Sequence, residues 1–133
     1  EKESMQSGNT NFTINKGIQN EFIFTIKQND GLLPMIIDPL DTFSFKIYDI
    51  NTDTLTAEVN NTASNINGEI EIYDAPNGQI KVILTSALTS ILKKERGGKE
   101  DKYYLKPSYR ISIDGTTVNN GKINPKIPLV YVE

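Results

Sequence analysis

Three oxygen-bearing side chains stand at alternate positions where a predicted strand ends. They are Asp49, Asn51 and Asp53, in the stretch DINTD. Carboxylate and amide oxygens at this spacing open the Ca²⁺-binding loop of EF-hands. The rest of that loop is absent, because Thr54 stands where Gly is needed and Asn60 stands where a bidentate Glu is needed. We therefore favour an Asx-rich turn between strands and keep the three residues as a weak metal candidate.

A second pair of groups could act as an acid and a nucleophile. Glu69 and Glu71 are two residues apart, so in a strand they share a face. Glycosidase carboxylates usually come from different strands at fixed separations, and simple alternation explains these two as a solvated face. Histidine and cysteine are absent from the sequence, which excludes His-based acid–base catalysis, Ser-His-Asp triads, His-ligated zinc and thiolate chemistry. The sequence predicts a binding or structural domain without a cofactor, not an enzyme.

The length and net charge of the chain limit further the classes of protein to which it can belong. The 133 residues fit a single domain, and the net charge is −3 with scattered Lys and Arg. Nucleic-acid binding needs clustered basic charge, so no nucleic-acid partner is expected. No apolar run approaches the roughly 20 residues of a membrane span, so no membrane insertion is expected. A small β domain without cysteine is typical of a reducing compartment or of an assembly that supplies stability.

Most of the chain alternates between apolar and polar residues, as strands do when one face is buried. Clear examples are EFIFTIKQ, DTFSFKIYDI and PSYRISID, and the turn signals NDG, PNG and DG lie between such segments. Seven or eight of them recur at intervals of about 8–12 residues. We predict an all-β fold, an antiparallel Ig-like β-sandwich. Residues 12–133 form its one domain, and residues 1–11 form a flexible N-terminal arm.

One segment breaks the alternation. GQIKVILTSALTSIL (78–92) begins as a strand and then places three apolar residues on one side of a helix: Leu88, Ile91 and Leu92. Thr85 or Ser86 can cap its first turn. We predict one short helix near residues 86–96, which plugs the open end of the sandwich. The charged, Gly-rich stretch KKERGGKEDK is then expected to be a surface loop.

Five segments follow one another in a distinctive order: FIFTIK (22–27), NDGLLPMIIDPL (29–40), FSFKI (43–47), GQIKVILTSALTSIL (78–92) and KPSYRISI (106–113). In this order, residues 12–133 resemble small β-sandwich virion structural proteins of tailed bacteriophages, similar to the N-terminal domain of phage baseplate upper proteins. Two features depart from that pattern. Ser108 stands where the family usually has Gly, and residues 95–104 look like an insertion, which suggests a contact surface particular to this chain.

The resemblance implies a non-enzymatic virion structural protein of the tail, baseplate or neck, assembled in the host bacterial cytoplasm. Such a protein acts through contacts with other virion proteins, in several copies of a symmetric assembly. We expect these contacts on the arm, the inserted loop and the closing strand, at Phe12, Ile14, Tyr103, Tyr104, Leu105, Ile127, Leu129 and Tyr131. The closing strand either adds to a neighbour's sheet or pairs within its own core, and we favour the core.

Two other functions remain open. Tyrosines close to lysines also suit stacking on sugars, so a carbohydrate-binding or adhesive β-sandwich on a virion or cell surface is the main alternative. Such a module would show a cluster of exposed aromatic rings with Asp or Asn on one face. The other alternative is a capsid decoration protein, which only its position on the particle distinguishes.

Overall fold

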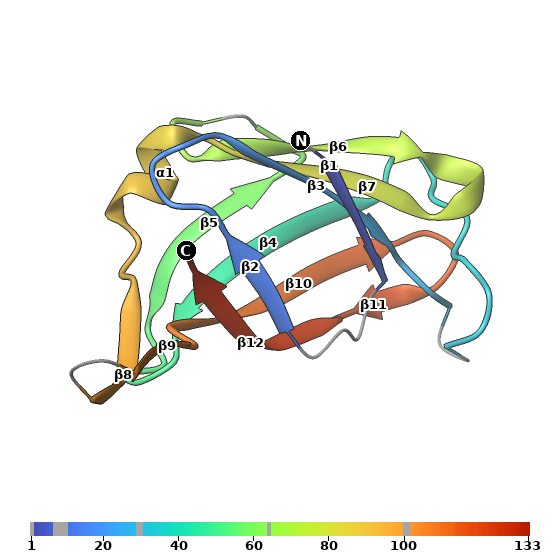
Figure 1. The fold of residues 1–133 in the computed structure, drawn as a ribbon. Coiled ribbons are helices and arrows are strands. Elements are labelled where there is room, and N and C mark those ends of the chain that lie inside the picture. Colours follow the sequence, from blue (N-terminus) through green and yellow to red (C-terminus); the bar gives the residue numbers. More distant parts are fainter. Residues whose placement is uncertain (1, 7–10, 29–30, 64, 100–101) are drawn as a thin grey trace.

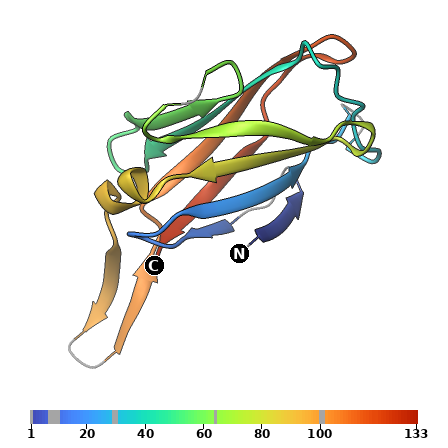
Figure 2. The same ribbon diagram turned by 90° about the horizontal axis from the view of Figure 1, so that it is seen from above.

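The protein is described here from a computed structural model, in which two β-sheets pack face to face (Figure 1). The structure describes residues 2–6, 11–28, 31–63, 65–99 and 102–133, without the side chains of residues 2–6, 11, 102 and 103. One short α-helix lies at an end of the sandwich, and a separate two-stranded hairpin extends from the same end (Figure 2). The prediction of an all-β sandwich with one short helix is confirmed.

The smaller sheet has the strand order β1-β3-β7-β6, with β1 at Lys2–Gln6, β3 at Asn20–Thr25, β7 at Gln79–Leu84 and β6 at Gly68–Asp74. The predicted hairpin around PNG joins β6 to β7 through a 3₁₀ turn, η1 (Ala75–Asn77). Gly78 closes this turn with φ 68°. A Cβ there would come within 2.7 Å of the Ile26 carbonyl oxygen, so both the conformation and the close approach of two backbones require glycine.

The larger sheet has the order β2-β12-β10-β4-β5, with β2 at Asn11–Ile14, β12 at Lys126–Val132, β10 at Tyr109–Thr117, β4 at Thr42–Asp49 and β5 at Leu55–Asn60. A short strand, β11 (Gly121–Ile123), pairs with the end of β10. In immunoglobulin terms, β3, β7 and β6 take the places of strands B, E and D. Strands β12, β10 and β4 take those of G, F and C, which makes the sandwich Ig-like.

The core fills the space between the sheets with the inward members of each alternating strand. Phenylalanines from both sheets meet at its centre: the ring of Phe12 lies 4.3 Å from that of Phe22, and Phe24 lies 5.8 Å from Phe45. Met35, from the connector after β3, is also fully buried. Tilted aromatic pairs at these distances add to the stabilisation that comes from burying their area.

The N-terminal segment differs from its prediction. Lys2–Gln6 forms β1, parallel to β3, and Asn11–Ile14 forms β2, parallel to β12, so the sheets are not purely antiparallel. Residues 1 and 7–10 of the expected arm lie outside the described residues. Polar composition suggested a free arm, but a strand at a sheet edge is held by backbone hydrogen bonds that any sequence can make. With β11 and the hairpin, these strands also raise the number above the expected seven or eight.

The helix is shorter than predicted, and the charged stretch after it is not a loop. The helix α1 spans Ser86–Ile91, and the side chain of Thr85 caps it by accepting a hydrogen bond from the Leu88 N–H. Leu92 then adopts an extended conformation and enters the core, while Ile91 points to solvent. The extended conformation of Leu92 ends the helix, and the chain continues into β8 (Glu95–Lys99) and β9 (Lys102–Lys106), which pair as a hairpin.

Candidate protein interface

The β8–β9 hairpin projects from one end of the sandwich (Figure 2), and within the described part of the chain its two strands pair with each other alone. Gly97 lies directly opposite Tyr104 in the register. A Cβ on Gly97 would come within 2.7 Å of the Tyr104 ring and hydroxyl, so this ring lies across the glycine. Covering a strand glycine with a cross-strand aromatic is a known way to steady a β-strand pair. Tyr104 is still 61% exposed, which leaves most of it free for a partner.

Tyr109 fixes the hairpin to the body. Its ring is buried at the start of β10, and its hydroxyl accepts a hydrogen bond from the Lys93 N–H at 2.8 Å. A tyrosine at the start of strand F with its hydroxyl bonded to upstream backbone is the tyrosine corner of Ig-like domains. Here the two bonded residues flank the whole hairpin, because the chain leaves the body at Lys93 and returns at Tyr109. This hydrogen bond therefore joins the two positions at which the hairpin is connected to the sandwich.

An ion pair strengthens the same connection between the hairpin and the sandwich, at Lys93. The Lys93 ammonium lies 2.6 Å from the Asp49 carboxylate, at the end of β4. Asp49 also accepts hydrogen bonds from the backbone N–H groups of Asn51 and Thr52, at 2.8 and 3.1 Å. Lys93 first, and then these two donors, lower the pKa of Asp49 to about 2, and the Asp49 carboxylate in turn raises the pKa of Lys93.

The outward face of the larger sheet carries a cluster of Tyr48 and Arg110 next to the base of the hairpin. The Arg110 guanidinium stacks over the Tyr48 ring at 4.1 Å, and its Nε donates to Asp53 at 2.7 Å. The register of β10 and β12 pairs Tyr109 with Val130 and then Ile111 with Ile127, so Pro128 and Leu129 both face Arg110 across a bulge. Leu129 is 37% exposed.

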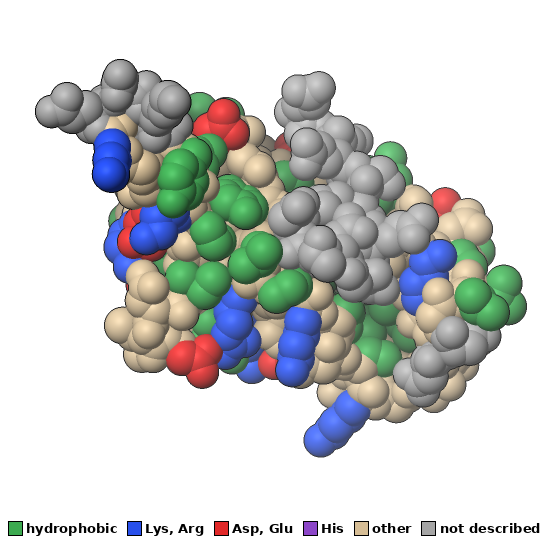
Figure 3. Space-filling model, turned by 60° about the horizontal axis from the view of Figure 1, so that its bottom comes forward, with side chains coloured by type: hydrophobic (Ala, Val, Ile, Leu, Met, Phe, Trp, Pro, Cys, Tyr) green, Lys and Arg blue, Asp and Glu red, His purple; other side chains and the backbone are tan. Residues whose placement is uncertain are grey.

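The hairpin and this sheet face lie at the same end of the domain. Lys94, Arg96, Tyr104 and Leu105 from the hairpin region surround a hollow of about 150 Å³ together with Glu133, which follows β12 directly. Figure 3 views this side of the molecule from below and shows hydrophobic side chains gathered with lysines and arginines among them. Exposed tyrosine and arginine in one area are typical of the centres of protein interfaces.

The structure brings together some of the predicted contact residues and buries others. Tyr104 and Leu105 lie on the hairpin, and Leu129 and the half-buried Tyr131 lie on the outward face of β12. The side chain of Tyr103 lies outside the described residues. Three predictions need correction, because their side chains belong to the core: Phe12, Ile14 and Ile127.

The closing strand lies inside its sheet. β12 pairs with β10 on one side and, from Leu129 onward, with β2 on the other, so this part has no free edge to offer a neighbouring sheet. This arrangement agrees with the core pairing that we favoured. Pro128, which lacks an N–H, stands at the bulge between β10 and β12.

The weak calcium candidate forms the Asx turn that we favoured. Asp49 accepts the Asn51 N–H and pairs with Lys93, while Asp53 pairs with Arg110, so both carboxylates already face cations. Asp53 has φ 58°, a left-handed conformation that suits this tight turn. Over the described ranges, no three His, Cys, Asp or Glu residues come together in a way that could hold a metal ion.

Three residues of this surface were not among the contact residues expected from the sequence: Tyr48, Arg110 and Arg96. The signal for the first two was present, because alternation along β4 and β10 places both on the outward face. Their contact depends on the register between these strands, which pairs Tyr48 with Arg110. Arg96 was missed because its segment was expected to be an irregular loop.

No family model matches the sequence, and no curated protein matches it. In the described part of the chain, no helix is long and apolar enough to cross a membrane.

Proposed function

We propose that this chain is a non-enzymatic structural domain of a bacteriophage virion. It docks onto other virion proteins through the β8–β9 hairpin and the adjoining face of β4, β10 and β12. The observation that carries the docking part is the projecting hairpin, whose exposed Tyr104 and Arg96 lie at the same end as the Tyr48–Arg110 cluster. The virion part rests on the resemblance of residues 12–133 to phage β-sandwich proteins.

The chemistry of this surface suits binding without catalysis. Arg110 is held by Asp53 on one side and by the Tyr48 ring on the other, so it loses little freedom when a partner covers it. Tyrosine and arginine are the residues that contribute most often to interface energy when they are desolvated. The hairpin holds Tyr104 and Arg96 beyond the end of the sandwich, where they can reach a partner that the flat sheet alone could not contact.

The experiment is immunogold labelling of phage particles purified from the source lysate. Label confined to the tail, baseplate or neck supports the proposal, and loss of that label when Arg96→Ser/Tyr104→Ser replaces the natural chain supports the hairpin as the contact. Label on the capsid instead indicates a decoration protein. Absence of label on purified particles contradicts the virion assignment.

One observation favours the carbohydrate-binding alternative. A groove of about 570 Å³ lies at the other end of the same sheet, lined by hydroxyl, amide and carboxylate side chains that include Ser44, Asn60, Asp114 and Asn124. Such groups bind sugar hydroxyls, but the residues that line the groove include no exposed aromatic ring. Glycan-array binding by the isolated domain that is lost in Asp114→Ala would favour this alternative over assembly.

A further inference from the structure

Charge is distributed unevenly between the hairpin and the rest of the chain. Residues 93–106 contain six Lys or Arg and three Asp or Glu, whereas the other 119 residues contain eight and fourteen. Lys94, Arg96, Lys99 and Lys106 are all exposed. A basic projection on an acidic body gives the molecule two surfaces of opposite sign.

The outward face of the smaller sheet is the acidic counterpart. The register places Glu69 of β6 and Glu21 of β3 on either side of Ile83, and Glu71 beside Lys81. Glu69 and Glu71 are exposed. Lys81 lies 3.2 Å from Glu71 and 3.9 Å from Glu21, so this lysine pairs with two of the three carboxylates. Ile83, half-buried in the middle, adds an apolar centre.

We propose that the partner of the hairpin is a second copy of this chain, bound through the acidic face of β3, β7 and β6. This inference rests on the proposed assembly function and names one of its contacts. Lys94 and Arg96 approach the carboxylates of that face, and Tyr104 packs on its apolar centre. Complementary charge steers such an encounter and fixes its orientation.

The two surfaces lie on different sides of one molecule. In Figure 1 the hairpin extends from the lower left, whereas β6 and β7 form the top of the sandwich. A hairpin therefore reaches the acidic face of another copy, and that copy still has its own hairpin free. Such head-to-tail contacts build a closed ring or an open filament, which agrees with the expected symmetric assembly.

The test uses purified full-length chain and sedimentation analysis at low ionic strength. We expect the wild-type chain to associate beyond the dimer as its concentration rises. The association should weaken at about 1 M salt, where the Debye length is about 3 Å. The hairpin variant Arg96→Ser/Tyr104→Ser and the face variant Glu69→Lys/Glu71→Gln should each lower the association constant by about tenfold or more.

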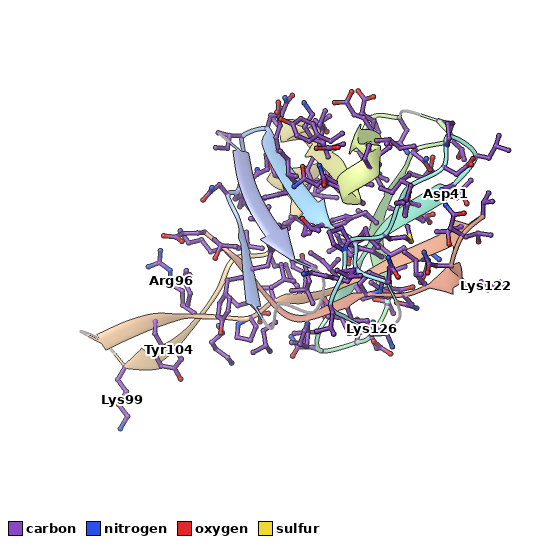
Figure 4. All side chains as sticks on the ribbon, turned by 90° about the vertical axis from the view of Figure 1, so that its right-hand side faces the viewer. Asp41, Arg96, Lys99, Tyr104, Lys122 and Lys126 are labelled. Atoms are coloured by element: carbon purple, nitrogen blue, oxygen red, sulfur yellow. The ribbon has the colours of Figure 1, made fainter. Side chains whose placement is uncertain are left out.

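A mixture of the two variants gives the sharpest result. The hairpin variant keeps an intact face and the face variant keeps an intact hairpin, so together they should form a one-to-one dimer that grows no further. The matched control Lys122→Ser removes a cation at the opposite end of the domain and should associate as the wild type does (Figure 4). Melting temperatures of all variants check that each is folded.

Four outcomes would overturn the inference: a monomeric wild-type chain, variants that associate as the wild type does, a mixture that stays monomeric, or a control variant that loses association. None of these depends on particle labelling. If the wild-type chain is monomeric but its label on particles is lost with the hairpin variant, the second copy is the wrong partner while the proposed docking through the hairpin stands.

Discussion

The body of the sandwich and the β8–β9 hairpin are both made of β-strands, but different forces hold them. In the body, β3, β7, β10, β12 and β4 each pair with strands on both sides, and side chains such as Phe24 and Leu84 are fully buried. In the hairpin, each strand has one neighbour, and Tyr104 covers a glycine while remaining mostly exposed. Two-stranded hairpins of this kind are at best marginally stable alone.

This difference separates the residues that specify the fold from those available for binding. A substitution in the body is expected to change the free energy of unfolding, because it opens a cavity or leaves a buried group without a partner. A substitution on the hairpin is expected to change association and leave unfolding nearly the same. The predictions below test this separation, starting with the largest expected effect.

Phe24→Ala should destabilise the domain most. Its ring is fully buried and lies within 6.4 Å of the Phe12, Phe22 and Phe45 rings. Removing a buried phenylalanine ring typically costs about 3–5 kcal/mol, which chemical denaturation measures. A loss below about 1 kcal/mol would mean that the phenylalanine cluster is not the centre of the core.

Tyr109→Phe should have an intermediate effect, because Tyr109 joins the two regions. The change keeps the ring but removes the acceptor of the part-buried hydrogen bond from the Lys93 N–H, at a cost of about 0.5–1.5 kcal/mol. Hydrogen exchange of the Lys93 amide should also become faster. If that amide exchanges at the wild-type rate, the tyrosine corner does not hold the hairpin.

The Asp49–Lys93 pair should make the stability of the fold depend on pH in the acidic range. Asp49 has a pKa of about 2 in the folded chain against its ordinary value of 3.8, so its charged form stabilises the fold. This contribution is complete above pH 3.8 and is lost as the pH falls through about 2. Thermal melts between pH 5 and 1.5 should show this loss, and Asp49→Asn should show a flatter profile over the same range. Equal slopes would contradict the assignment.

Gly97→Ala should have the smallest effect on unfolding, within about 0.5 kcal/mol. Its added Cβ forces the Tyr104 ring away from its place across the strand, so association should still weaken. Lys122→Ser, at the opposite end of the domain, is the control and should leave both unfolding and association unchanged. A large change in the free energy of unfolding for Gly97→Ala would mean that the hairpin belongs to the cooperative fold. The separation between residues that stabilise the fold and residues that bind would then not hold.

The sandwich could be predicted because its strands alternate. Phe43, Phe45 and Ile47 face inward, and Ser44 and Lys46 face outward, as the sequence indicates. The hairpin could not be predicted, because Gly97–Gly98 and dense charge resemble a loop when the cross-strand contact with Tyr104 is unknown. The burial of Phe12 was also missed, because it depends on the parallel pairing of β2 with a strand more than 100 residues away.

The candidate interface was predictable only in part. Tyr104 and Leu105 could be selected because they lie on or next to the segment that looks like an insertion. Leu129 and Tyr131 could be selected because they lie on the closing strand. The stacking of Arg110 on Tyr48 could not, because it depends on strand register. The opposite charges of the hairpin and of the smaller sheet's face required knowing which side of the molecule each occupies.

The most direct test of the account measures one variant in two ways. Residues 95–106 are replaced by a two-residue Asn-Gly turn, and its thermal unfolding and its sedimentation are compared with those of the wild-type chain. The account predicts a cooperative transition at nearly the wild-type temperature together with loss of association. Retained association, or a body that no longer unfolds cooperatively, would contradict the claim that the sandwich carries the fold and the hairpin carries assembly.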